Sequence, residues 1–260
     1  MKVALIQMEV VAGDVAVNRA NGLRMAHEAA KQADVVILPE IWTTGYALRN
    51  VEEQAENEHG PTLTGLKEIA QTYQTTIISG SIPFCTDEKI FNSAFVINPA
   101  GELIACYHKI HLFQFMGEER FFAPGMERCT FPLHGTTAGL AICYDLRFPE
   151  LFRSLTMDGA TMIFLPAEWP AARGEHWRTL VQARAIENQV YLCAVNCVGQ
   201  HRANPFYGHS LIIGPGGDII AEGGAGEEIL YGEIDPDQVG AIRHNMPVWK
   251  DRRPALYRQS

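Results

Sequence analysis

The 260-residue chain has little positive charge and no long apolar run. Its 21 Lys and Arg residues face 30 Asp and Glu residues, which gives a formal net charge of -9. Because an acidic surface repels phosphates, this balance argues against nucleic acid as a partner. No stretch approaches the roughly 20 apolar residues of a membrane span. No targeting segment is visible either, because Glu9 interrupts the first apolar run and no small-residue cleavage site follows.

Paired cysteines and several common enzyme motifs are also missing. The six cysteines form no CxxC pair, and most lie in apolar, strand-like runs, which indicates buried free thiols and fits a reducing cytoplasm. We find no GxSxG elbow, no P-loop and no GxGxxG fingerprint. Serine-elbow hydrolases, P-loop enzymes and dinucleotide-binding enzymes are therefore disfavoured.

The composition is that of a globular protein with a large core, since 47% of the residues are hydrophobic and 20% are charged. There is no linker, repeat or low-complexity tract, so we predict one domain over residues 1–260. The last segment, from about residue 246, is polar and carries Pro247 and Pro254. We expect this tail to pack at a subunit interface rather than in the core.

Apolar periodicity predicts strands that alternate with helices. The predicted helices cover residues 18–32, 61–73, 149–158 and 176–188. The predicted strands cover residues 3–8, 35–38, 76–81, 91–97, 103–107, 140–143, 162–165, 191–195, 211–213, 219–221 and 229–234. Because direct hairpins accompany the helical crossovers, we predict an α/β fold with mixed sheets and helices packed on them.

Three reactive side chains stand at the ends of three predicted strands: Glu40, Lys109 and Cys143. The carboxyl ends of strands are where ligand sites collect in α/β sheets. A thiol is mostly protonated at neutral pH, so it needs a base such as a carboxylate to become a nucleophile. A lysine can stabilise an oxyanion or protonate a leaving amine. Each residue alone also has a structural explanation, as a loop charge, an edge-strand lysine or a buried thiol.

Two other hydrolase classes use the same residue types. A papain-like thiol protease would pair Cys143 with a histidine, for which His108, His111 or His176 is available, but the surrounding papain-type signature is absent. A metal hydrolase could use His108 and His111, although no third ligand stands out. The sequence favours a site made of Glu40, Lys109 and Cys143 over both of these classes.

The motifs around the three residues resemble those of the nitrilase superfamily of carbon–nitrogen hydrolases, and the resemblance covers nearly the whole chain. The motifs are Leu38-Pro39-Glu40 with Gly45-Tyr46, the segment His108-Lys109-Ile110-His111-Leu112-Phe113, and the segment Ile142-Cys143-Tyr144-Asp145-Leu146-Arg147-Phe148-Pro149-Glu150. Matching blocks follow at residues 169–170, 183–189, 208–210 and 252–254. The resemblance implies a four-layer α-β-β-α sandwich, a homodimer or larger assembly, and no metal or organic cofactor.

By matching positions, the resemblance assigns Glu40 as the general base, Lys109 as the charge stabiliser and acid, and Cys143 as the nucleophile. The family carries a second glutamate a short way past the lysine, and Glu118 is the best match, with Glu119 adjacent. The implied reaction forms a thioester on Cys143 with loss of ammonia, after which Glu40 activates water. Lys109 and the backbone N–H of Tyr144 would hold the oxyanion.

The substrate is predicted less directly. The chain looks most similar to the omega-amidase branch, whose members hydrolyse the terminal amide of short keto acids such as 2-oxoglutaramate. Such a substrate carries a carboxylate, for which Arg173 and Arg147 are candidate partners. Many omega-amidase-like chains have asparagine where this chain has Glu168, and a carboxylate facing the pocket would repel an acidic substrate.

That departure leaves several small-molecule substrates open: a neutral aliphatic amide, a cationic amide or an N-carbamoyl compound. A nitrilase activity, or a catalytically silent member that acts as a binding module, are further alternatives. Phe115, Tyr144 and Trp169 are predicted pocket walls, although aromatic residues more often belong to the core.

Overall fold

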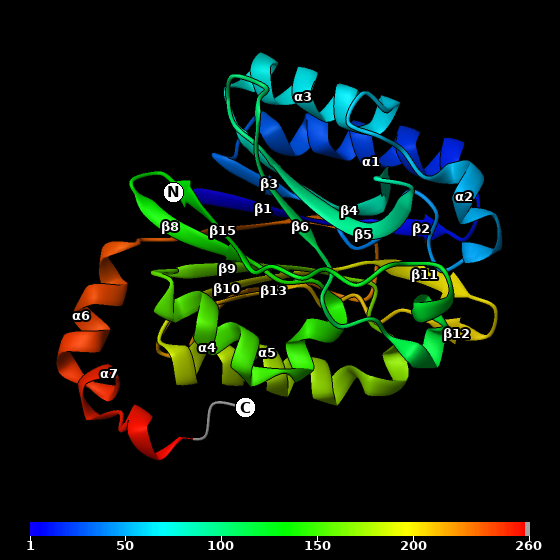
Figure 1. The fold of residues 1–260 in the computed structure, drawn as a ribbon. Coiled ribbons are helices and arrows are strands. Elements are labelled where there is room, and N and C mark those ends of the chain that lie inside the picture. The colour runs from blue at the N-terminus through cyan, green and yellow to red at the C-terminus, as the bar shows by residue number, and fades with distance from the viewer. Residues whose placement is uncertain (258–260) are drawn as a thin grey trace.

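The computed structural model describes residues 1–257 and places two six-stranded sheets face to face with helices on their outer sides (Figure 1). The first sheet has the order β15 (Glu228–Glu233), β1 (Lys2–Gln7), β3 (Val35–Ile37), β4 (Thr76–Thr86), β5 (Lys89–Ile97), β6 (Leu103–His108). The second has the order β14 (Ile219–Glu222), β13 (Leu211–Ile213), β10 (Tyr191–Asn196), β9 (Met162–Ala167), β8 (Thr136–Leu140), β7 (Cys129–Leu133). Parallel and antiparallel pairs occur in both sheets.

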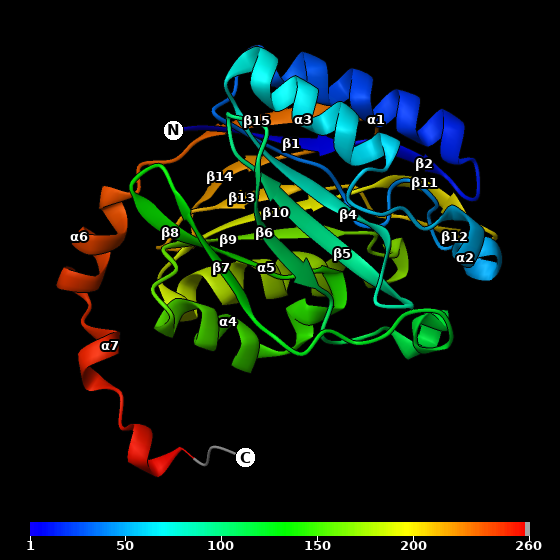
Figure 2. The same cartoon turned by 45° about the horizontal axis from the view of Figure 1, so that its top comes forward.

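Two pairs of helices complete the four layers. The first sheet is covered by α1 (Val15–Ala30) and α3 (Pro61–Tyr73), and the second by α4 (Pro149–Met157) and α5 (Gly174–Asn188) (Figures 1 and 2). The predicted α-β-β-α sandwich with mixed sheets is therefore confirmed. Shorter elements lie at the ends and in the loops: α2 (Val51–Gln54), α6 (Asp237–Asn245), α7 (Val248–Asp251), and a small sheet of β2 (Glu9–Val11), β11 (Val198–His201) and β12 (Asn204–Pro205).

Strand β1 shows why its sequence is continuously apolar. Side chains alternate between the two faces of a strand. Val3 and Leu5 belong to the apolar cluster that also holds residues of the second sheet, α4 and α5, whereas Ala4 and Ile6 belong to the cluster with α1 and α3. All four are fully buried, because both faces of the first sheet are covered.

Some predicted boundaries were wrong. Residues 140–143 were predicted as a strand, but β8 ends at Leu140 and Cys143 begins a 3₁₀ helix, Cys143–Arg147. The β7–β8 hairpin, β2, β11, β12 and α6 were not predicted. The strands of the small sheet have only two to four residues, too few to show an alternating pattern.

The tail predicted from about residue 246 forms α7 and a 3₁₀ turn, Pro254–Leu256, and its last three residues lie outside the described residues. It runs outside the sandwich on the side of α4 and α5 (Figures 1 and 2). The ring of Trp249 lies beneath the guanidinium groups of Arg153, Arg243 and Arg252, at 4.8, 5.3 and 5.2 Å. Within residues 1–257, no helix is long and apolar enough to cross a membrane.

Candidate active site

Glu40 is positioned by a turn that leaves β3 and stays bonded to β4 through Leu38 and Pro39. The turn comes close to Gly80, which has a φ of +66°, and a Cβ there would clash with the Pro39 carbonyl oxygen. The backbone N–H of Ile41 donates to Ser81 Oγ at 2.9 Å, which fixes the other side of the turn. The Glu40 side chain is thereby held between the two sheets, fully buried.

Lys109 follows β6 directly and extends its pairing, since its N–H donates to the Asn92 carbonyl at 2.9 Å. Its ammonium donates to Glu40 Oε1 at 2.7 Å and to both carboxyl oxygens of Glu118 at 2.8 Å. All three side chains are fully buried. The structure therefore brings together three of the four predicted catalytic residues in one charged cluster.

Neutral groups satisfy the remaining bonds of the two carboxylates. The Asn92 amide donates to Glu40 Oε1 at 2.9 Å, the Tyr46 hydroxyl donates to Glu118 Oε1 at 3.0 Å, and the Phe113 N–H donates to Glu118 Oε2 at 2.7 Å. Buried charges are tolerated when they are paired and hydrogen-bonded in this way. The cluster is therefore preorganised rather than assembled on binding.

The charges in the cluster shift one another's pKa values. Burial lowers the pKa of the Lys109 ammonium, but the carboxylates of Glu118 and Glu40 more than offset this, so its pKa is raised. Burial raises the pKa of Glu118, with Lys109 opposing the shift and Glu40 adding to it. Lys109 thus stays charged at neutral pH and can stabilise negative charge in the site.

Cys143 lies on a sharp bend between β8 and the 3₁₀ helix, with a φ of +45°. This left-handed backbone is strained for a residue with a Cβ. Asp145 holds the bend: its Oδ2 accepts from the Ile142 N–H at 2.8 Å and from the Tyr107 hydroxyl at 2.7 Å, and His111 Nδ1 lies 2.7 Å from its Oδ1. The surroundings thus maintain a bend that directs Cys143.

The Cys143 thiol is 3% exposed, and the structure places it beside Glu40 and Lys109. Burial, and then the Glu40 carboxylate, raise the pKa of the thiol well above its ordinary range, while Lys109 lowers it. The resting group is therefore a thiol that must lose its proton during attack. The Glu168 N–H donates to Glu40 Oε2 at 3.0 Å, which orients the carboxylate that would accept this proton.

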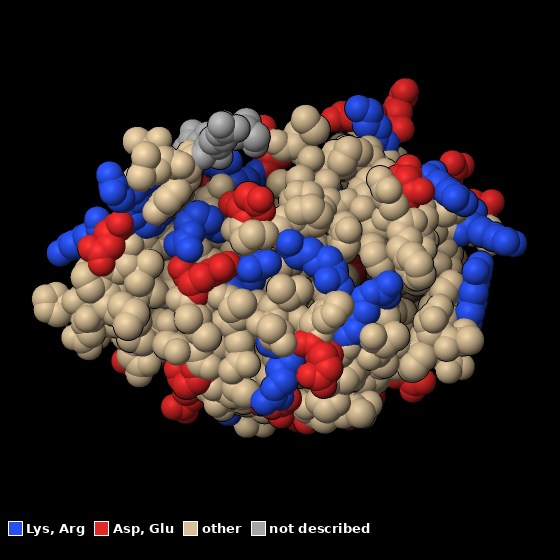
Figure 3. All heavy atoms as spheres, turned by 90° about the horizontal axis from the view of Figure 1, so that it is seen from below, with Lys and Arg blue, Asp and Glu red and all other residues tan. Residues whose placement is uncertain are grey.

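A narrow cavity of about 10 Å³, roughly the space of one water molecule, opens onto Cys143. Its walls are Phe113, Tyr144, Arg147, Trp169, Pro170 and Arg173. Among residues 1–257, no carboxylate oxygen lies within 4 Å of either arginine. Burial, and then the charge of Arg173, lower the pKa of Arg147. On the α4–α5 side of the molecule, Lys and Arg side chains gather toward the middle (Figure 3).

The predicted pocket residues separate into two groups. Tyr144, Trp169, Arg147 and Arg173 line the cavity at Cys143. Phe115 does not: it is 74% exposed, with the Arg173 guanidinium 5.0 Å from its ring centre.

Glu168 is also absent from the cavity wall and is 1% exposed. Among the described residues, its carboxyl oxygens accept from no N–H or O–H group, and the Cys197 thiol is the one polar side chain that lowers its pKa by hydrogen bonding. Burial, and then Glu40, raise the pKa of Glu168 well above its ordinary range. The raised pKa favours the neutral form of this carboxyl, and a neutral side chain that does not line the cavity would not repel an acidic substrate.

The structure also distinguishes the two adjacent glutamates. Glu118 is fully buried against Lys109, whereas Glu119 points outward, 3.5 Å from Arg120. Asn92 and Tyr46, which bond to the carboxylates, were not predicted as site residues. The sequence does hold a sign of each role: Asn92 is a polar residue inside an apolar strand, and Tyr46 belongs to the glutamate motif.

The histidines proposed for other hydrolase classes make other contacts. His108 Nδ1 lies 2.7 Å from Ser93 Oγ, and His111 is engaged by Asp145. His176 lies 3.4 Å from Arg147, outside the cavity wall. Over residues 1–257, no group of three or more His, Cys, Asp and Glu residues is arranged to hold a metal ion.

Comparison with known proteins defines the class. The model of the carbon–nitrogen hydrolase family matches residues 2–244, and the chain belongs to this family. The 2-oxoglutaramate amidase of Bacillus subtilis is 39% identical over 98% of each chain. Human omega-amidase NIT2 is 33% identical over 98% of this chain and 96% of its own. A structure of a CN-hydrolase superfamily protein from Xanthomonas campestris, with an arsenic adduct in its active site, is 31% identical and superposes with a TM-score of 0.91 over 100% of this chain and 99% of the other.

Proposed function

We propose that the protein hydrolyses a primary carboxamide to a carboxylic acid and ammonia through a thioester on Cys143. The observation that carries this proposal is the buried cluster of Glu40, Lys109 and Glu118 beside the thiol at the bend. A carboxylate base, a fixed cation and a positioned nucleophile are what acyl transfer from an amide requires. No metal or organic cofactor is needed in this scheme.

The first half of the reaction forms the thioester. Glu40 takes the thiol proton as Cys143 sulfur attacks the amide carbon, and the ammonium of Lys109 and the Tyr144 N–H stabilise the oxyanion. Glu40 then gives this proton to the amide nitrogen as the carbon–nitrogen bond breaks, and ammonia leaves. In the second half, Glu40 deprotonates water, which attacks the thioester, and the carbon–sulfur bond breaks as the proton goes back to sulfur. Glu118 positions Lys109 through both carboxyl oxygens.

We further propose that the substrate is the omega-amide of a short keto acid, such as 2-oxoglutaramate. Arg147 and Arg173 stand on the wall of the Cys143 cavity without an acidic partner, and a guanidinium binds a carboxylate bidentately. Relatives with the names 2-oxoglutaramate amidase and omega-amidase, similar over nearly the full chain, support the same substrate class.

Ammonia release from a panel of amides tests the proposal. We expect 2-oxoglutaramate to exceed a neutral aliphatic amide, a cationic amide and an N-carbamoyl compound in kcat/KM. Mass spectrometry of substrate-treated protein should show an acyl adduct that is absent from Cys143→Ala. Cys193→Ala, which removes another buried thiol, is the control and should keep full activity. Full turnover in Cys143→Ala would refute the mechanism, and preference for a neutral amide would refute the substrate assignment alone.

We propose that the chain forms a homodimer through the α4–α5 side and the tail, in a reducing cytoplasm. Met157, Ile186, Met246 and Leu256 leave apolar side chains exposed on these elements, and such surfaces mark subunit contacts. The proposed reducing cytoplasm is supported by the six cysteines, all of which are free thiols. Light scattering of the full chain and of a chain ending at residue 245 tests the assembly, since only the full chain should have the dimer mass.

A further inference from the structure

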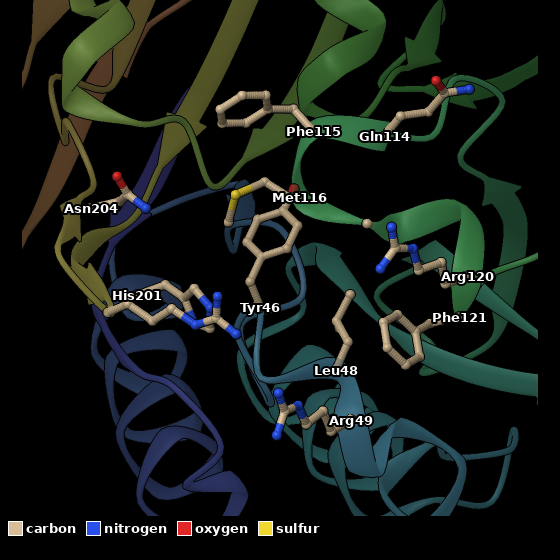
Figure 4. A pocket seen from close by; sticks show the side chains of 12 residues that line it. Tyr46, Leu48, Arg49, Gln114, Phe115, Met116, Arg120, Phe121, His201 and Asn204 are labelled. Carbon is tan, nitrogen blue, oxygen red and sulfur yellow. The ribbon is translucent and has the colours of Figure 1, made fainter.

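A second cavity, of about 450 Å³, lies beyond Tyr46 (Figure 4). It shares no wall residue with the cavity at Cys143. Its walls come from the loop around Leu48, from residues 114–121 and from the turn between β11 and β12. The proposed amidase reaction gives this space no role.

Three arginines line this cavity, each from a different segment. Arg49 belongs to a 3₁₀ turn, Leu48–Asn50, Arg120 to another, Glu118–Arg120, and Arg202 to the turn after β11. Within residues 1–257, no carboxylate lies within 4 Å of Arg49 or Arg202, and Arg120 has only its neighbour Glu119, at 3.5 Å. Arginines without an ion pair also occur elsewhere in residues 1–257, for example Arg153 and Arg243, so the distinguishing feature of these three is that they converge on one cavity.

Polar atoms without partners accompany the arginines. His201 Nδ1 is buried beside the cavity and makes no hydrogen bond to any described residue. An adjoining cavity of about 360 Å³ shares Arg49, Arg202 and His201, and the buried Gln54 Oε1 on its wall also lacks a partner. Buried polar atoms normally have partners, so their absence indicates a place for a ligand or water. Burial, and then Arg202, lower the pKa of His201, which leaves a neutral ring able to donate or accept.

The wall of this cavity connects directly to the proposed catalytic cluster. Tyr46 is 6% exposed, and its hydroxyl donates to Glu118 Oε1, which accepts from Lys109. Residues 114–121 contribute Arg120 to the cavity and Glu118 to the cluster. A ligand that draws the arginines together would therefore act on the segment that holds Glu118.

We propose that this basic cavity binds a small, multiply charged oxyanion, either a dicarboxylate or a phosphate. Guanidinium groups form paired hydrogen bonds to both kinds of oxyanion, and several arginines around one cavity favour a ligand with more than one negative charge. Arg147 and Arg173 lie on the other cavity and are separate from this site. Binding here does not depend on the identity of the amide substrate.

Isothermal titration calorimetry with inorganic phosphate, succinate and acetate tests the site. We expect phosphate and succinate to bind more tightly than acetate. Arg49→Ala/Arg202→Ala should weaken the binding of both by at least about tenfold, because two charge-assisted contacts are lost. The matched control, Arg24→Ala/Arg128→Ala, removes the same charge from arginines that pair with Glu227 and Asp158, and it should change binding less than twofold.

Several outcomes would overturn the proposal. Equal weakening in both double variants would show that only overall charge matters. A loss in Arg147→Ala instead would place the anion at the Cys143 cavity. No measurable heat at millimolar anion would show that there is no site, and acetate binding as tight as succinate would refute the requirement for multiple charge. Amide turnover in anion-free buffer should be unchanged in Arg49→Ala/Arg202→Ala, so failure here is distinguishable from failure of the amidase proposal.

Discussion

The two sheets contribute to the candidate site in different ways. The first sheet supplies Glu40 and Lys109, charged groups whose buried atoms are joined by hydrogen bonds. The second supplies Cys143, a neutral thiol on a strained bend that Asp145 holds from outside the cavity. Charge must be compensated before it can be buried, whereas a thiol needs only to be aimed. The first sheet therefore positions its reactive groups by pairing their charges, and the second positions its thiol by the conformation of the backbone.

Removing the charge of Lys109 from the first sheet should have the largest effect on stability and turnover. Lys109→Met leaves two carboxylates buried against each other, so we expect the free energy of unfolding to fall by about 3–5 kcal/mol. Amide turnover should fall by at least about 10²–10³-fold, because an oxyanion donor is lost. Urea unfolding and ammonia release measure the two effects. Lys31→Met, an exposed control, should change neither, and near-normal turnover in Lys109→Met would contradict the role of the cluster.

Loosening the bend in the second sheet should have a smaller effect. Asp145→Asn keeps the side-chain shape but replaces an acceptor oxygen with a donor NH₂, so one of the contacts to Ile142, Tyr107 or His111 is lost. We expect a loss of about 1–3 kcal/mol in stability, because Asp145 is fully buried. Turnover should fall roughly tenfold or more through misplacement of Cys143. The control is Asp158→Asn, which breaks only an exposed pair with Arg128. Unchanged kcat with lowered stability would show that the bend does not aim the thiol.

The smallest effect on stability is expected for Glu168, whose buried carboxyl has no pairing cation and only the Cys197 thiol as a hydrogen-bonding side chain. Its pKa is raised by folding, so its contribution to stability is complete below its ordinary pKa and is lost as pH rises toward the folded value. Glu168→Gln cannot titrate. We therefore expect the Tm of this variant relative to the parent protein to increase between pH 5 and pH 8, as measured by thermal unfolding at each pH.

The same variant should keep turnover within a fewfold at neutral pH, because the native side chain is already neutral there. If instead the Tm of the variant relative to the parent protein fell as pH rises, Glu168 would be ionised in the folded protein. Such a result would also restore the predicted conflict with an acidic substrate.

Local sequence patterns predicted much of the fold, because strands buried on both faces read as apolar runs. They missed the β7–β8 hairpin and the extent of the strand before Cys143, because Thr136–Leu140 is short and Gly139 weakens its strand pattern. Glu40, Lys109 and Cys143 were named from their positions at strand ends and from family motifs. Their convergence could not be derived locally, since it depends on two sheets packing face to face. The orientation of Glu168 and the basic cavity also arise only from tertiary packing.

The pairing of β1 with β15 has a consequence for how the protein is made. Gln7 and Glu228 are partners in this pair, and the amino group of Met1 donates to the carbonyl of Ile234 at 3.0 Å. A strand synthesised at the beginning must therefore wait for one that leaves the ribosome near the end. Until then, β1 presents one open edge, and such edges invite association with other chains. The protein is expected to fold slowly for its size and to depend on chaperones during translation, because a contact spanning most of the chain closes its first sheet.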